Sequence, residues 1–173
     1  GNLSALGKGL REAHALGLID RLPRIAGVQA AAADPFYQSY RTGFQQKIQL
    51  TASTTQASAI RIGAPVSHDK AKRVVQEFNG VALSVSEAEL MEAKALADRA
   101  GIAVCPNSGV ALAGLRQLLA NGTIRREESV VAIMTAQKNP IPEWLAPRLT
   151  EYDVVWLMHT LFPAFMNGCR SLG

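Results

Sequence analysis

Short apolar runs alternate with longer amphipathic stretches along this chain. Continuous apolar runs suit strands that are covered on both faces, as in a parallel sheet. We therefore predict strands at residues 25–28, 81–85, 102–104 and 130–134.

The stretches between these runs carry the spacing and the end signals of helices. Gly17 and Gly101 stand where two of them should end. Ser67 is a predicted cap, and Ser86 with Glu89 spells a capping box, in which each side chain bonds the other's backbone amide. Helices are predicted at residues 4–16, 35–40, 68–78, 87–99 and 110–120.

Strands that alternate with helices predict an α/β fold, with a mainly parallel sheet and flanking helices. The polar stretch 45–56 is predicted to be irregular or an edge, and residues 105–109 a turn. Ligands of such sheets bind beyond the carboxyl ends of the strands. The residues of interest there are Gln29, Asn107, Ser108 and Thr135.

Composition narrows the class of protein. With 173 residues, 48% apolar and 18% charged, the chain can bury the core of one ordinary domain. The net charge of +4 comes from scattered basic residues, so no nucleic-acid partner is indicated. No apolar run is long enough to predict a membrane span. Two cysteines cannot form a disulfide framework and fit a reducing compartment.

Most of the familiar catalytic and binding patterns are missing. The three histidines lie far apart and no Cys-x-x-Cys pair occurs, so no metal site is predicted. Cys105, placed before a proline, is predicted to be a buried, inert thiol rather than a nucleophile. Gly7-Lys8-Gly9 lacks the third glycine of a dinucleotide fingerprint.

The opening of the chain offers a binding feature. Gly1 and Asn2 lead directly into the first predicted helix. The first amides of a helix have no partner within it and the helix dipole favours an anion, so this start could cradle a phosphate. Taken alone, the pattern favours an ordinary helix cap, because many helices begin with Gly, Asn or Ser.

Gly1 to Gly9 resembles the second half of the Gly-Asn-x-Gly-Asn phosphate loop of threonine synthases, which are pyridoxal-phosphate enzymes of fold type II. The resemblance is strongest at Ala57 to Ser67, which is similar to the family's Ala-Ser-Ala-Ile-x-Ile-Gly-x-Pro-Val-Ser segment. It continues through Cys105 to Leu112, close to the plant-type sequences, and ends at Ala136. We therefore expect residues 1–136 to be the C-terminal part of a threonine-synthase-like domain and 137–173 to be a divergent tail.

The resemblance implies a reaction and a set of site residues. Threonine synthases convert O-phospho-L-homoserine and water to L-threonine and phosphate with pyridoxal 5'-phosphate as cofactor. By resemblance, the backbone amides of Gly1 and Asn2 hold the cofactor phosphate, and the hydroxyl of Thr135 contacts the pyridine nitrogen. Asn107 and Ser108 are the cofactor-binding residues that face the ring.

The substrate side of the site is expected at Ser58 and Ala59. No catalytic residue is predicted, because no lysine here has the sequence context of the family's Schiff-base lysine. We therefore expect an inactive fragment. After Ala136 the family's His-Gly-Leu-Lys is replaced by Gln137-Lys138-Asn139-Pro140. The following tail, with an apolar patch at residues 154–166, is either a divergent terminus or a partner-binding helix.

Two other functions stay open. One is another fold-type-II enzyme, such as a threonine or serine dehydratase or a cysteine synthase, and the other is a non-catalytic interaction fragment. The resemblance implies a homodimer for the full-length enzyme, located in the plastid stroma or a bacterial cytoplasm. If neighbouring strands are missing, the uncovered edges and apolar faces predict self-association.

Overall fold

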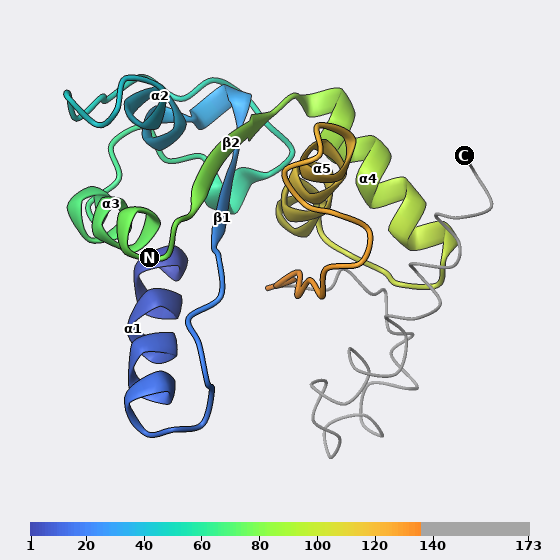
Figure 1. Ribbon diagram of the computed structural model, residues 1–173. Coiled ribbons are helices and arrows are strands. Elements are labelled where there is room, and N and C mark those ends of the chain that lie inside the picture. The colour runs from blue at the N-terminus through green and yellow to red at the C-terminus, as the bar shows by residue number, and fades with distance from the viewer. Residues whose placement is uncertain (136–173) are drawn as a thin grey trace, which may run out of the picture.

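The computed structural model describes residues 1–135 (Figure 1). Within these residues, two strands and five α-helices carry the architecture, with two short 3-10 turns in the connections. In chain order the elements are α1 (Asn2–Ala15), β1 (Ala26–Ala30), η1 (Ala31–Ala33), α2 (Pro35–Arg41), η2 (Ser58–Ile60), α3 (His68–Glu77), β2 (Val81–Val85), α4 (Glu87–Arg99) and α5 (Pro106–Ala120).

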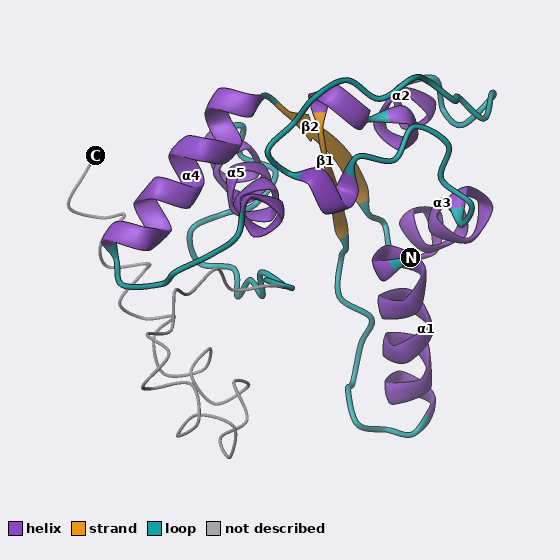
Figure 2. Cartoon of the chain, turned by 180° about the vertical axis from the view of Figure 1, so that it is seen from behind, coloured by secondary structure: helices purple, strands orange, loops and turns teal. Residues whose placement is uncertain are grey.

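The centre of the fold is a parallel pair of strands. β1 and β2 run in register from Ala26 opposite Val81 to Ala30 opposite Val85. Helices α1, α2 and α3 lie on one side of this pair, and α4 and α5 lie on the other (Figure 2). The α/β prediction with a parallel sheet and flanking helices is therefore confirmed.

Two of the four predicted strands are wrong. Residues 102–104 and 130–134 form no strand in the described part of the chain. A strand is defined by its backbone ladder, and within residues 1–135 the only strand pairing is that of β1 with β2. Residues 130–134 still alternate like a strand: Ala132 and Met134 pack on the core, whereas Val131 and Ile133 are 87% and 48% exposed.

The helix starts differ from prediction at two places. Helix α1 begins at Asn2 rather than at residue 4. The turn predicted at 105–109 is wrong, because Pro106 opens α5 with Cys105 as its cap residue. Proline suits this position, since its fixed φ is helical and it lacks only an amide that would have no partner.

The local end signals were predicted more accurately. The capping box is present, with the Glu89 amide donating to Ser86 Oγ at 3.3 Å and the Ser86 amide donating to Glu89 Oε2 at 2.7 Å. Ser67 is the cap residue of α3, but its side chain makes no capping hydrogen bond. Gly17 and Gly101 follow α1 and α4 with φ of 70° and 83°, a conformation that favours glycine.

The core is divided between the two sides of the strand pair. The α4–α5 cluster, on one side, consists of Ala30, Ala57, Val85, Leu90, Ala93, Ala97, Val104, Val110, Leu112 and Ala113. The α1–α3 cluster, on the other, consists of Ile25, Val74 and Phe78, with leucines of α1 packed against it. A third group, made of Phe36, Val75 and Ala82, joins α2, α3 and β2.

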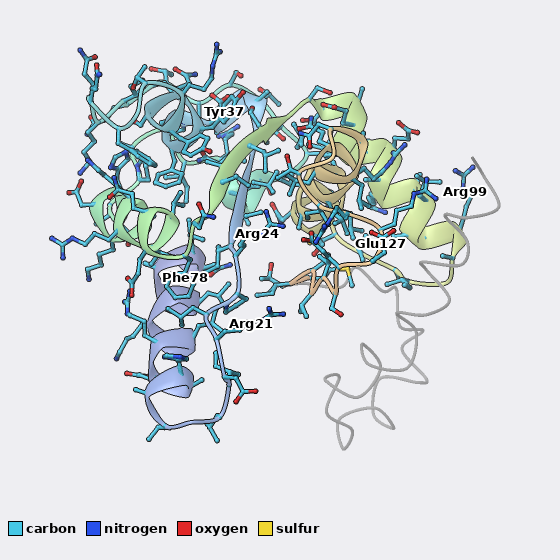
Figure 3. All side chains as sticks on the ribbon, in the orientation of Figure 1. Arg21, Arg24, Tyr37, Phe78, Arg99 and Glu127 are labelled. Atoms are coloured by element: carbon cyan, nitrogen blue, oxygen red, sulfur yellow. The ribbon has the colours of Figure 1, made fainter. Side chains whose placement is uncertain are left out.

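Close helix packing depends on small residues. A side-chain carbon at Gly7 would run into Val74 of α3, and one at Gly114 would run into Val28 of β1. Both glycines therefore let a helix backbone approach its neighbour. A polar contact also joins distant segments: Arg24, labelled in Figure 3, reaches from the stretch before β1 to Glu128 Oε2 at 2.9 Å.

The predicted tail at 137–173 lies outside the described residues. Within residues 1–135, no helix is long and apolar enough to cross a membrane. Residues 45–56 contain no helix or strand, as predicted. Cys105 is buried, also as predicted.

Candidate cofactor and substrate site

The first turn of α1 has no capping side chain among the described residues. Gly1 is exposed, and a side-chain carbon there would meet nothing within 4 Å. The Gly1 carbonyl accepts from the Ala5 amide at 3.1 Å and from Ser4 Oγ at 2.8 Å, which fixes the first turn. The leading amides of the helix therefore fit a phosphate, such as that of pyridoxal phosphate.

Ser58 and Ala59 follow a segment that is hydrogen-bonded just beyond the carboxyl ends of both strands, to Ala32 and to Glu87. They form η2 with Ile60 and are exposed. The preceding residue, Ala57, is fully buried in the α4–α5 cluster with the last residues of β1 and β2. The η2 turn also contacts α5. This is the edge of a parallel sheet at which ligands bind.

The segment before η2 is tied to the start of α4. Thr55 Oγ1 donates to Glu87 Oε2 at 2.8 Å, and the Gln56 amide donates to Glu87 Oε1 at 2.8 Å. The Ala57 amide in turn donates to Thr55 Oγ1 at 3.1 Å. One carboxylate thus holds three consecutive residues, directly or through Thr55.

Asn107 and Ser108 lie in the first turn of α5 rather than on a loop. Ser108 is buried, with its Oγ 3.4 Å from Cys105 Sγ, and Asn107 Nδ2 donates to the same sulfur at 3.7 Å. Asn107 Oδ1 is buried and has no hydrogen-bond partner among the described residues. Within this group, Asn107 therefore keeps an acceptor available for a ligand.

Two opposing effects act on the pKa of the Cys105 thiol. Burial raises the pKa of Cys105, while hydrogen bonds from the side chains and amides of Ser108 and Asn107 lower it. The hydrogen bonds outweigh burial, so the pKa lies below the usual value for a thiol. The thiol is nevertheless enclosed by its neighbours.

Thr135 and the chain start lie on different sides of the strand pair. Thr135 is exposed and follows Ala132 and Met134, which pack on the α4–α5 cluster. Leu3, beside the chain start, packs on the α1–α3 cluster. In Figure 1 the N-terminus lies on the α3 side of β1, and the last described segment, in orange, lies on the side of α5. The structure therefore does not bring Gly1 and Asn2 together with Thr135, and a joint site stays a prediction.

Other features of the described chain lie apart from these residues. No group of three His, Cys, Asp or Glu side chains within residues 1–135 could hold a metal ion. A hollow of about 410 Å³ lies beside α2 and is lined by Asp34, Tyr37, Gln38, Arg41, Thr42 and Ile48. None of the predicted site residues lines it.

Comparison with known proteins decides the family. A family model described as "Pyridoxal-phosphate dependent enzyme" matches residues 1–136. The chain belongs to this family. Membership implies pyridoxal phosphate as the cofactor, and the open start of α1 is chemically suited to its phosphate group.

The curated relatives of this chain include threonine synthases. Threonine synthase 2, chloroplastic, from Arabidopsis thaliana is 44% identical over 137 residues, which cover 79% of this chain and 27% of the relative. Threonine synthase from Methanocaldococcus jannaschii is 41% identical over 136 residues, covering 78% and 34%. The chain thus spans about a third of the length of the curated relatives it matches.

A solved structure supports the fold. The crystal structure of a T.th. threonine deaminase superposes with a TM-score of 0.50 at 26% identity, covering 70% of this chain and 40% of that one. The fold class is therefore that of a partial fold-type-II pyridoxal-phosphate enzyme.

Sequence reasoning missed the contact of Glu87 with Thr55 and Gln56. Glu87 stands inside the capping-box motif, where it reads as an ordinary first-turn acid. Nothing in the spacing of residues 55 and 87 marks them as partners, so only the structure could show it.

Proposed function

We propose that this chain is the C-terminal portion of a plant-type threonine synthase, a lyase of threonine biosynthesis. The reaction is the conversion of O-phospho-L-homoserine and water to L-threonine and phosphate. The observation that supports it best is the collinear identity of residues 1–136 with threonine synthases, including a plant enzyme at 44%.

The residues would divide the work as follows. Bound pyridoxal phosphate supplies the electron sink for proton removal and phosphate elimination. The amides after Gly1 and Asn2 bind the cofactor phosphate at the start of α1. The neutral hydroxyl of Thr135 would contact the pyridine nitrogen and would leave it largely unprotonated, and Asn107 and Ser108 would face the ring.

The substrate would lie against Ser58 and Ala59, because both are exposed at the carboxyl edge of the strands. By itself the chain would not turn over, since none of its lysines has the sequence context of the family's lysine. That lysine both holds the cofactor and moves protons in this chemistry.

The activity is tested in a chimera in which residues 1–136 replace the matching segment of the Arabidopsis relative, 27% of that chain. We expect threonine and phosphate from O-phospho-L-homoserine. A chimera that folds and binds pyridoxal phosphate yet makes no threonine would contradict the proposal. For the chain alone, we expect no borohydride-trapped lysine adduct with pyridoxal phosphate, and such an adduct would overturn its inactivity.

Thr135 is tested in the same chimera. Thr135→Ala should weaken cofactor binding because it removes the hydroxyl, and Thr135→Ser should retain it. Cofactor affinity is measured by fluorescence titration. An unchanged affinity and absorbance spectrum in Thr135→Ala would remove this residue from the site.

A second candidate is a threonine or serine dehydratase. The fold likeness to a threonine deaminase favours it. The product separates the two proposals, because a dehydratase would release a keto acid from threonine or serine and leave O-phospho-L-homoserine unchanged. Cysteine synthase and a non-catalytic interaction fragment are the remaining alternatives.

We also propose a compartment and an oligomeric state for the full-length enzyme. The chloroplastic relative supports the plastid stroma, and the alternative is a bacterial cytoplasm. The full-length enzyme is proposed to be a homodimer that acts on a small-molecule substrate.

A further inference from the structure

The segment that carries Ser58 and Ala59 crosses the ends of both strands with few polar anchors. Upstream, the Ser53 amide donates to the Ala32 carbonyl at 2.9 Å. Within residues 54–59 of the described chain, the hydrogen bonds to another secondary-structure element all end on Glu87. The remaining polar contacts of these residues are local, such as the Ile60 amide donating to the Ala57 carbonyl.

Glu87 is not needed to cap its own helix. Ser86 and Glu89 already form the capping box, in which the Glu89 carboxylate accepts from the Ser86 amide and hydroxyl at 2.7 Å each. The carboxylate of Glu87 is thus turned away from the helix start and toward Thr55 and Gln56. Hydrogen bonds to a carboxylate are stronger than neutral ones, which favours a fixed segment.

The contact also lies beside the buried end of the strands. Thr55 is buried, and its hydroxyl both donates to Glu87 and accepts from the Ala57 amide. Ala57 belongs to the same buried cluster as Ala30 and Val85, the last residues of β1 and β2. A shift of the Glu87 contact would therefore be passed on to the next two residues, Ser58 and Ala59.

We propose that Glu87 is a positioning residue for the substrate side of the site. Its carboxylate fixes residues 55–57 over the carboxyl ends of β1 and β2, and this sets the place of Ser58 and Ala59. The substrate role of these two residues rests on the proposed function, whereas the positioning by Glu87 does not.

The positioning is tested by amide hydrogen exchange, followed by NMR on the full chain. Glu87→Ala should speed exchange at Gln56 and Ala57 about tenfold or more, as expected for the loss of one hydrogen bond. Exchange at Val85 and Leu115 should stay unchanged. Glu87→Gln should restore protection at Gln56, because its amide oxygen still accepts a bond. Thr55→Val should speed exchange at Ala57.

Glu92→Gln is the matched control, because Glu92 lies on the same helix, is exposed and pairs with Arg116 rather than with residues 55–57. The proposal is overturned if Glu87→Ala exchanges at Gln56 and Ala57 no faster than this control. It is equally overturned if exchange rises throughout β2 and α5, because Glu87 would then support the whole fold rather than one segment.

A titration with the proposed substrate separates the positioning role of Glu87 from the proposed function. O-phospho-L-homoserine added to the full chain should shift the amide signals of Ser58 and Ala59, with at least fivefold weaker binding in Glu87→Ala. If the unsubstituted chain shows no shifts there, the substrate role of Ser58 and Ala59 fails. The exchange rates report on the positioning in either case.

Discussion

The two sides of the strand pair are built very differently. On one side α4 packs on α5, and α5 packs on β1 and β2, with the large α4–α5 cluster between them. On the other side α1 rests mainly on α3, through the small α1–α3 cluster and the close approach of Gly7 to Val74. Figure 2 shows α1 extending away from the body of the fold.

This difference bears on function because the predicted site residues are divided between the sides. The start of α1, which is suited to the cofactor phosphate, belongs to the weakly packed side. Ser58, Asn107 and the segment of Thr135 belong to the strongly packed side. Segments with few buried contacts open at the lowest free energy, so α1 should loosen before α4 and α5 do.

The largest expected effect tests the strongly packed side. Leu90 is fully buried in the α4–α5 cluster. Leu90→Ala should lower the free energy of unfolding by about 2–5 kcal/mol, because it removes apolar contact and leaves a cavity. Urea unfolding followed by circular dichroism measures it. A loss below about 1 kcal/mol would mean that this side is not the main source of stability.

A pair of glycine variants tests the weakly packed side. Gly7→Ala places a carbon where Val74 lies and should cost about 1–3 kcal/mol, chiefly by lifting α1 off α3. Gly9, on the same helix, has open space around it. Gly9→Ala should therefore stabilise by about 0.4–1 kcal/mol, since alanine favours the helix.

The two glycine variants are compared by urea unfolding and by amide exchange within α1. Equal effects of the two substitutions would show that contact with α3 does not hold the helix. Faster exchange of α1 in Gly7→Ala, with α5 unchanged, would sharpen the contrast between the two sides.

An intermediate effect is expected at Glu89, which joins α4 to α5. Hydrogen bonds from the Ser86 side chain, Gln117 and the Ser86 amide lower the pKa of Glu89, against an opposing effect of burial. A lowered pKa in the folded state stabilises the fold above the unfolded-state pKa of about 4.3. This stability is lost as the pH falls through the folded-state pKa.

Glu89→Gln should therefore be less stable than the unsubstituted chain at pH 7, by about 0.5–2 kcal/mol as for other capping residues. The difference in unfolding free energy between the two proteins should shrink as the pH falls through the folded-state pKa of Glu89, because the carboxyl group is then uncharged, like the glutamine side chain. Urea midpoints at several pH values measure it. If the difference in unfolding free energy between the two proteins is the same at pH 7 and in acid, the charge of Glu89 does not contribute to stability.

The smallest effect is expected for the surface ion pair between α1 and α3. Arg11 Nη1 lies 2.7 Å from Glu77 Oε2, and both side chains are 41% exposed. Solvent screens such a pair, so Arg11→Ala should cost no more than about 1 kcal/mol. A thermal unfolding midpoint that falls as far as in Gly7→Ala would mean that the ion pair, rather than apolar packing, docks α1.

Local signals were read from the sequence with good accuracy. The bounds of β2, the capping box at Ser86 and the glycines that follow α1 and α4 all depend on a few neighbouring residues. The helix that follows Gly1 was likewise predicted, although it starts at Asn2, two residues earlier than expected. Each of these features forms from groups close together along the chain.

Features that depend on residues far apart in the sequence were not predicted. Residues 130–134 have the side-chain alternation of a strand, but the described chain offers them no ladder. The contact of Glu87 with Thr55 joins residues from different elements and leaves no spacing signal. A shared contact of Gly1 and Thr135 with one cofactor is of the same kind, because the two residues are far apart in the sequence and lie on different sides of the strand pair.

The register of β1 with β2 has a consequence for how the protein reaches its native state. Paired residues such as Ala26 and Val81 are about 55 positions apart, so the pairing closes a long loop at a large entropic cost. Parallel pairing of this kind is slow compared with helix formation. We therefore expect a refolding intermediate with formed helices and unpaired strands, which stopped-flow circular dichroism would detect as an early gain of helix signal. Because unpaired strand edges can pair between chains, refolding at low protein concentration should recover more soluble protein than refolding at high concentration.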